Sequence, residues 1–179
     1  IEHPAIAAVT LTGSAKAGAA VAAKAASVIK PAVLELGGSD PLLVLADAPL
    51  DEIMDELVFS KFQNNGQSCV AAKRFLVEDA IYDTFLEKLI PKVAQLKAGN
   101  PLEEGTNLGP QARADLRNLL KNQVDSSVAA GATIVYQQTY IPETGYFYPP
   151  TILANIPAHA PAYTQELFGP VLSLYRFSS

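Results

Sequence analysis

The run LELGGSDPLLVL, residues 34–45, contains two short apolar segments separated by a pair of glycines. Residues 33–36 and residues 42–45 each have the length and the apolar composition of a strand. The two glycines and the proline between them interrupt the apolar pattern, because these residue types favour turns over regular structure. The run therefore predicts two strands separated by a tight turn.

The sequence on either side of this run alternates between strand and helix patterns. Upstream, residues 6–11 predict a buried strand, and an alanine-rich segment to about Ile29 predicts a helix ended by Pro31, which closes a β-α-β unit. Downstream, strands are predicted at residues 74–77, 133–136, 151–153 and 171–177. The alternation predicts an α/β fold in three layers, with a mostly parallel sheet and helices on both of its faces.

Three helices are predicted in this downstream part. The first begins near Pro49, with a plausible cap at residues 47–50, and ends at about Phe62. The other two follow from apolar residues that recur every three or four positions, which places them on one face of a helix. These residues are Ile81, Phe85, Leu89, Val93 and Leu96 in one helix, and Ala112, Leu116, Leu119, Leu120, Val124 and Val128 in the other.

Composition excludes several classes of partner. The chain has 179 residues, of which 49% are hydrophobic, so it can bury a core, and its net charge of -5 disfavours binding to nucleic acid or to an acidic membrane. Charged residues or prolines interrupt every apolar run, so no membrane span is expected. A single cysteine fits a reducing compartment, and we expect a cytoplasmic protein without a metal site. The first residues do not resemble a signal peptide, and both ends suggest a piece of a longer chain.

The lone cysteine, Cys69, follows the polar run Asn65-Gly66-Gln67-Ser68. A lone cysteine is most often a small buried hydrophobe, but a polar turn after an apolar helix is a poor place to bury one. On such a turn the sulfur could attack a substrate while the backbone N–H of Cys69 stabilises the resulting oxyanion. The two histidines, His3 and His159, lie in loops without a motif, which disfavours a cysteine–histidine hydrolase.

Glu35 is the candidate base for this cysteine. It lies at the end of a predicted buried strand, where desolvation would favour a carboxyl group that accepts a proton. The alternative is a structural glutamate held by backbone N–H groups or by a lysine, and the residues alone leave both readings open.

Several motifs together resemble those of the NAD(P)-dependent aldehyde dehydrogenase superfamily, in the order and at spacings compatible with that family. They are LELGG at residues 34–38, FQNNGQSC at 62–69, ELFGPV at 166–171, and LTGS at 11–14 followed by Gly18, with Leu11 in place of the usual phenylalanine. The segment at 99–110 also resembles a family loop, and the resemblance covers the whole chain. It implies that Cys69 is the nucleophile and Glu35 the base.

The implied mechanism is aldehyde oxidation. Cys69 attacks the aldehyde to give a thiohemiacetal, hydride passes to NAD or NADP, and Glu35 activates the water that hydrolyses the thioester. The resemblance implies that Glu166 holds the nicotinamide ribose with Phe168 packed nearby, and that Gly13, Ser14, Gly18, Leu36 and Gly37 complete the cofactor site. Residues 1–36 would be the last part of the dinucleotide-binding domain, and residues 37–179 a catalytic domain truncated at its C-terminus.

Within the superfamily, the chain is most similar to bacterial succinate-semialdehyde dehydrogenases. Some members have an arginine where Gln63 stands, which binds the distal carboxylate of the substrate, and Gln63 can only hydrogen-bond to that group. The family implies a homodimer or a homotetramer, and a chain of this length alone should have little activity, because part of the oxyanion hole and of the adenine site would be missing. Two alternatives stay open, a cofactor-independent thiol esterase and a catalytically silent fragment.

Overall fold

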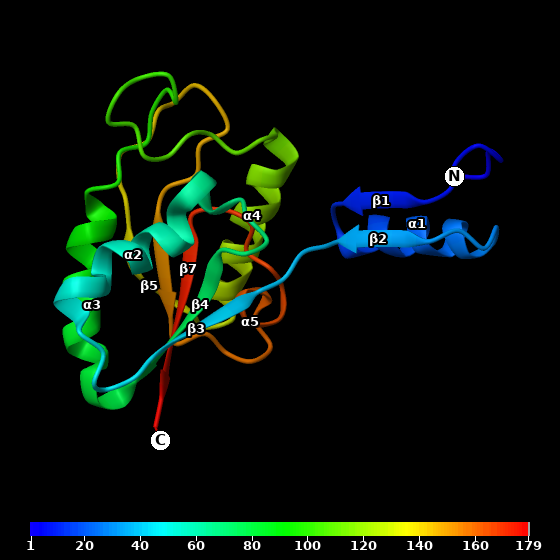
Figure 1. Cartoon of the computed structure of the whole chain (residues 1–179). Helices are drawn as coiled ribbons and strands as arrows, with labels where there is room; N and C mark the ends of the chain where they lie inside the picture. Colours follow the sequence, from blue (N-terminus) through cyan, green and yellow to red (C-terminus); the bar gives the residue numbers. More distant parts are fainter. Residues whose placement is uncertain (179) are drawn as a thin grey trace. The chain divides into compact units, whose positions relative to one another are not determined.

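The computed structural model describes residues 1–178, which form two compact units, residues 1–38 and residues 39–178. Each unit is described by itself (Figure 1). Among the described residues, no helix is both long enough and apolar enough to cross a membrane.

The N-terminal unit is a single β-α-β motif, as predicted. Strand β1 (Val9–Thr12) and strand β2 (Ala32–Glu35) are parallel, and helix α1 (Ala15–Ala26) connects them. The expectation that both strands are buried is wrong. The side chains of β1 alternate between partly buried and exposed, and those of β2 are exposed except at one position. The reason is that one helix packs on this pair of strands, so within residues 1–38 the other face of the pair has no cover.

The C-terminal unit contains a five-stranded sheet with the order β3-β4-β7-β6-β5. The strands are β3 (Asp40–Val44), β4 (Ala72–Glu78), β5 (Thr133–Gln137), β6 (Thr151–Ala154) and β7 (Val171–Phe177). All neighbours are parallel except β5 and β6, which are antiparallel. The prediction of a mostly parallel sheet is therefore confirmed, with an antiparallel strand at one edge.

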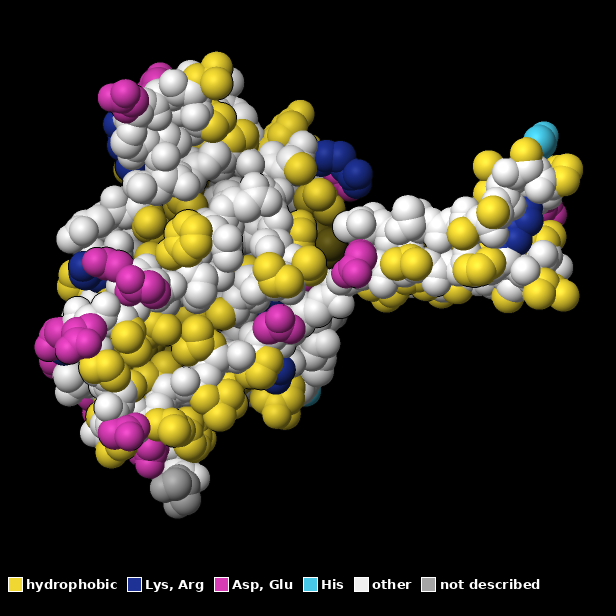
Figure 2. Space-filling model, viewed as in Figure 1, with side chains coloured by type: hydrophobic (Ala, Val, Ile, Leu, Met, Phe, Trp, Pro, Cys, Tyr) yellow, Lys and Arg dark blue, Asp and Glu magenta, His cyan; other side chains and the backbone are white. Residues whose placement is uncertain are grey.

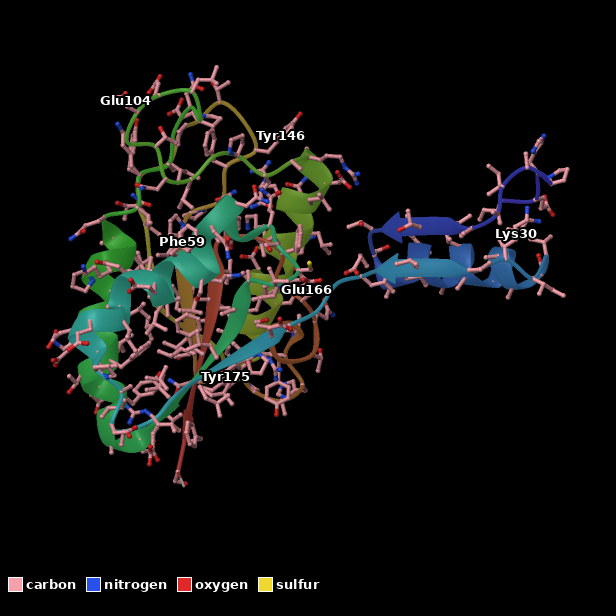
Figure 3. The ribbon with its side chains drawn as sticks, in the orientation of Figure 1. Lys30, Phe59, Glu104, Tyr146, Glu166 and Tyr175 are labelled. Atoms are coloured by element: carbon pink, nitrogen blue, oxygen red, sulfur yellow. The ribbon has the colours of Figure 1, made fainter. Side chains whose placement is uncertain are left out.

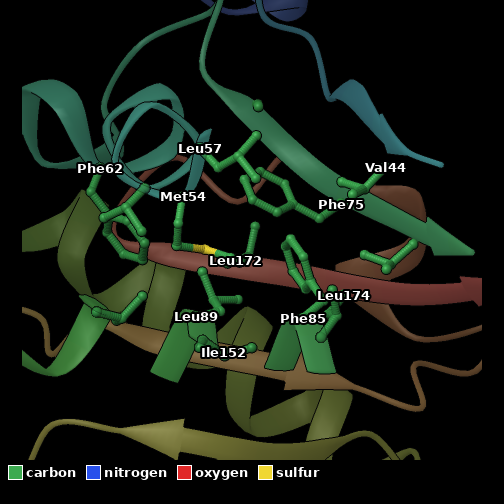
Figure 4. Packing of buried hydrophobic residues seen from close by; sticks show 14 of the residues in the cluster. Val44, Met54, Leu57, Phe62, Phe75, Phe85, Leu89, Ile152, Leu172 and Leu174 are labelled. Atoms are coloured by element: carbon green, nitrogen blue, oxygen red, sulfur yellow. The ribbon is translucent and has the colours of Figure 1, made fainter. Parts of the chain in front are cut away.

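Helices cover both faces of this sheet, which gives the three layers. Helices α2 (Leu50–Phe62) and α3 (Tyr82–Ala94) cover one face, and α4 (Ala114–Ala129) and the short α5 (Pro161–Thr164) cover the other (Figure 1). Short 3₁₀ turns at Gln63–Gly66 and Asp79–Ile81 follow α2 and precede α3. Figure 4 shows the larger core, in which side chains of α2 and α3 interdigitate with those of the central strands: Met54, Leu57, Phe75, Phe85, Leu89, Leu172 and Leu174.

The buried face of α4 differs from the predicted one. Leu120 and Val124 are buried, but Leu119 and Val128 are exposed. Polar contacts explain the difference: the Gln123 amide donates to the Glu166 carbonyl, and the hydroxyl of Ser127 accepts a hydrogen bond from the backbone N–H of Ala162. These bonds turn the polar residues of α4 inward and displace the apolar stripe.

Candidate active site

A tight turn links α2 to β4 and carries the lone cysteine. Three consecutive residues of this turn, Asn64, Asn65 and Gly66, have positive φ values of 49°, 59° and 69°. Asparagine and glycine are the residue types that adopt this conformation most readily. The Asn64 side chain donates to the carbonyl of Gln67 at 2.8 Å, which holds the turn closed. The sequence Asn-Asn-Gly therefore reverses the chain at the end of α2.

Gly66 is required at this turn for a second reason. A Cβ atom at position 66 would lie 2.2 Å from the backbone carbonyl oxygen of Gly169. No side chain fits in that gap, so the cysteine turn packs directly on the backbone of the loop before β7. The side-chain oxygen of Gln67 also accepts a hydrogen bond from the backbone N–H of Ala112 at 2.9 Å, which fixes the turn to a third segment.

Cys69 lies on the outer side of this turn and is exposed. The alternative reading, in which Cys69 is a buried core residue, is therefore wrong within the C-terminal unit. The backbone N–H of Ala71 donates to the carbonyl of Ser68, which closes a second turn around Cys69. The thiol is thus presented to solvent at the start of a buried central strand.

Lys73, the second residue of β4, lies beneath this turn with its side chain 1% exposed. Its ammonium donates to the carbonyls of Ser68 at 2.7 Å and Cys69 at 2.9 Å. It also forms an ion pair of 3.0 Å with the carboxylate of Glu166, which lies in the loop between α5 and β7 (Figure 3). A longer bond of 3.5 Å to the carbonyl of Ala71 gives the ammonium three carbonyl acceptors, one for each N–H, and the carboxylate of Glu166 balances its charge.

A second lysine is buried beside this pair. Lys61, near the end of α2, has a fully buried side chain, and its ammonium has no hydrogen-bond partner among the described residues. Burial and the nearby charge of Lys73 lower the pKa of Lys61 to about 7, against the opposing effect of Glu166. Lys61 is therefore partly uncharged near neutral pH, and Glu166 stays paired with Lys73.

The predicted cofactor residues of the N-terminal unit surround the start of α1. The Ser14 side chain accepts a hydrogen bond from the N–H of Ala17 at 3.2 Å and caps the helix. The first turn of α1 contains no acidic residue, so its positive end is not neutralised. A Cβ atom at Gly18 would lie 2.6 Å from the Leu36 side chain, so Gly18 allows close packing of helix on strand.

A phosphate group fits this helix end by charge and by donor type. Backbone N–H groups at the start of a helix bind phosphate, and Ser14, Lys16 and Gly13 are all exposed there. Gly37, which follows β2, is also exposed, whereas Leu36 is partly buried. The residues present therefore suit the pyrophosphate of a dinucleotide.

Glu35 is the last residue of β2 and is exposed in its unit. The prediction that its carboxylate lies inside a buried strand is wrong, because nothing in residues 1–38 covers this face of the strand pair. A proton-accepting role for Glu35 must therefore rest on its motif and not on desolvation within this unit.

Gln63 lies at the rim of an open groove beside the cysteine turn. The groove has a volume of about 680 Å³ and lies between α2, α3 and the loop after α3. Phe59, labelled in Figure 3, also lines it and is 66% exposed. Figure 2 shows hydrophobic side chains gathered on the surface of the C-terminal unit. Phe168, predicted near the cofactor, is 37% exposed, which leaves its ring free for a contact.

The structure thus brings together Cys69, Glu166 and two lysines that the sequence analysis did not single out. A lysine in a strand or at a helix end usually has a solvated charge, so neither Lys61 nor Lys73 gave a signal by itself. Glu35, Gly13, Ser14, Gly18, Leu36 and Gly37 are placed within the other unit.

A parallel sheet with a cysteine on a strained turn at the start of a central strand, together with a β-α-β unit suited to a dinucleotide, is typical of a cysteine-dependent dehydrogenase. The model of the aldehyde dehydrogenase family matches residues 1–179, and the chain belongs to this family.

Among the relatives, an NADP(+)-dependent succinate-semialdehyde dehydrogenase of Mycobacterium avium is 49% identical over 98% of this chain and 37% of the relative. The succinate semialdehyde dehydrogenase [NAD(P)+] Sad of Escherichia coli is 45% identical over 97% of this chain and 38% of the relative. The solved succinic semialdehyde dehydrogenase of Streptococcus pyogenes, in complex with NADP+, has a TM-score of 0.94 at 38% identity and covers 98% of this chain and 39% of its own. The chain therefore spans less than two fifths of the length of these relatives.

Proposed function

We propose that this chain contributes the nucleophile and part of the cofactor site to an enzyme that oxidises an aldehyde to its carboxylic acid. The observation that carries the proposal is the exposed thiol of Cys69 on a turn whose geometry is fixed on three sides. A rigid turn presents sulfur and backbone N–H together, which is what attack on a carbonyl requires.

In the proposed reaction the sulfur of Cys69 attacks the carbonyl carbon and the backbone N–H of Cys69 donates to the developing oxyanion. Bound NAD or NADP supplies the hydride acceptor that turns this adduct into a thioester. Glu35 then takes a proton from water, which releases the acid and frees Cys69. The motif that contains Glu35 supports this role, as does the exposure of its carboxylate to solvent within its unit.

The proposed cofactor contacts follow from the same residues. The N-terminus of α1, with Gly13 and Ser14, would hold the pyrophosphate, and the close packing of Gly18 on Leu36 would bring this helix end near the strand. Gly37, which is exposed, and Phe168 would lie against the nicotinamide side. The carboxylate of Glu166, positioned by Lys73, would accept hydrogen bonds from the ribose hydroxyls.

We propose succinic semialdehyde as the substrate, because the named relatives act on it and because a polar Gln63 lines the groove beside the turn. The amide of Gln63 can donate to one oxygen of a distal carboxylate. The test compares succinic semialdehyde with butanal on the full-length enzyme, with NAD and with NADP. A kcat/KM for the semialdehyde no higher than that for butanal would remove this substrate.

The reaction class has a separate test. The full-length Cys69→Ser enzyme should lose aldehyde-dependent reduction of the cofactor, whereas a wild type that cleaves esters but reduces no cofactor with any aldehyde would favour the thiol esterase. The matched control is Ser68→Ala, which keeps the thiol. We also propose that the enzyme is a homodimer or a homotetramer, and light scattering of the purified enzyme would test this oligomeric state. We propose the cytoplasm as its location.

A further inference from the structure

We propose that Lys73 is a positioning residue that aims the backbone N–H of Cys69 at the oxyanion, by holding the peptide group between Ser68 and Cys69 from beneath. This inference rests on the proposed function, in which that N–H stabilises the oxyanion. Lys73 touches neither substrate nor cofactor in this scheme; it acts on the oxyanion donor through the backbone of the turn, separately from its ion pair with Glu166.

The ammonium group of Lys73 holds two neighbouring carbonyls of the cysteine turn. Lys73 enters from β4 with its side chain 1% exposed, and it donates to two successive carbonyls, those of Ser68 and Cys69. The carbonyl of Ala71 is farther away, at 3.5 Å. Both short bonds hold their carbonyl oxygens on the buried side of the turn.

The planarity of the peptide between Ser68 and Cys69 fixes the direction of the Cys69 N–H. The described residues contain no cis peptide bond, and in a trans peptide the C=O and the following N–H point in opposite directions. Because the C=O of Ser68 points inward to Lys73, the N–H of Cys69 must point outward. That is also the side on which the thiol of Cys69 is exposed. Sulfur and N–H therefore face the same solvent-accessible side of the turn.

The charge of Lys73 also affects how strongly the Cys69 N–H donates. A cation that binds the oxygen of a peptide group polarises that group and makes its N–H a stronger donor, an effect that grows in a buried setting. The Lys73 ammonium is buried, and its charge is balanced by Glu166 at 3.0 Å. Lys73 thus both orients the oxyanion donor and strengthens it.

The experiment replaces the ammonium and keeps most of the side-chain volume. In full-length Lys73→Met, kcat/KM for the aldehyde should fall by about 10- to 100-fold, less than the roughly 10²–10³-fold loss on deleting an oxyanion donor, because the N–H is misdirected and not removed. Alkylation of Cys69 by iodoacetamide forms no oxyanion, so its rate should change by less than about 3-fold. Lys121→Met, an exposed lysine paired with Asp125, is the matched control and should behave as wild type.

A spectroscopic measurement separates positioning from a general loss of structure. The infrared carbonyl band of the thioester on Cys69 should move to higher frequency in Lys73→Met, because a weaker donor polarises the carbonyl less. Where Lys73→Met does not fold, Lys73→Gln, which is shorter and uncharged, carries the same expectations. Equal losses in oxidation and alkylation, or an unmoved carbonyl band, would overturn the inference. Wild-type enzyme that oxidises no aldehyde would instead refute the proposed function.

Discussion

Replacing Gly66 with alanine should destabilise the cysteine turn, and the size of this loss follows from the φ of Gly66 and from its contact with Gly169. Gly66 has a φ of 69°, and an alanine in this left-handed region costs about 1–2 kcal/mol. The added Cβ would also lie 2.2 Å from the carbonyl oxygen of Gly169, whereas ordinary contact begins at 3.4 Å. Both atoms in this contact belong to or are attached directly to the backbone, so the turn must move by about 1 Å, and such overpacking costs about 1–3 kcal/mol.

Gly105 provides a matched control on the same unit. Its φ is 78°, but a Cβ there would meet nothing within 4 Å. Gly105→Ala should therefore show only the conformational cost of about 1–2 kcal/mol, and Gly66→Ala the total of about 2–5 kcal/mol. The difference between the two variants isolates the packing of the turn on Gly169.

Urea unfolding of the full-length protein, followed by fluorescence, gives the midpoints for both variants and the wild type. Gly66→Ala should also lower kcat/KM by about 10²-fold, because a shift of about 1 Å in the turn displaces Cys69 from its attack geometry. Equal midpoints for the two variants would refute the packing argument. A destabilised Gly66→Ala with unchanged kcat/KM would refute the link between the turn and the thiol.

Three further predictions concern Lys61, Glu166 and the helix cap at Ser14. The pKa of Lys61 is lowered to about 7 in the folded state, so the unfolded chain binds more protons than the folded chain between about pH 7 and 10.5. The free energy of unfolding should therefore rise with pH by roughly 1 kcal/mol per pH unit in this range. Lys61→Met should reduce this slope in urea unfolding, and an unchanged slope would contradict the prediction. Glu166→Gln should weaken NADP binding in calorimetry by about 10-fold or more, since hydrogen bonds to a charged acceptor contribute about 1.5–3 kcal/mol; an unchanged Kd would exclude the ribose contact. Ser14→Ala should destabilise α1 by about 1 kcal/mol, seen as faster amide exchange in residues 15–18, whereas Ser126→Ala within α4 should leave α1 unchanged.

Much of the fold follows from sequence pattern because the apolar periodicity of this chain is strong. Phe85, Leu89 and Val93 recur on one face of α3 and are all fully buried. The direction of β5 was not predictable, because an antiparallel edge strand has the same apolar pattern as a parallel one. Helix α5 is only four residues long, which is too short to show a helical period.

The site was predictable where chemistry depends on residue type and hidden where it depends on distant contacts. Cys69 and Gly66 stood out in a polar turn, but the reason for Gly66 is the backbone of Gly169, which is far away in sequence. Lys73 gave no signal because its partners are backbone carbonyls and the carboxylate of Glu166. The burial predicted for Glu35 failed because strand pattern alone does not tell how many layers cover a sheet.

The most direct test of the central claim is to locate the covalent intermediate. Full-length Glu35→Gln enzyme would be mixed with succinic semialdehyde and NADP, quenched in acid and analysed by peptide mapping with mass spectrometry. Because the base that activates water is removed, a succinyl group should accumulate on the peptide that contains Cys69, and reduced cofactor should form in equal amount. An acyl group on another residue, or reduced cofactor without any acyl-enzyme, would contradict the role of Cys69 as nucleophile.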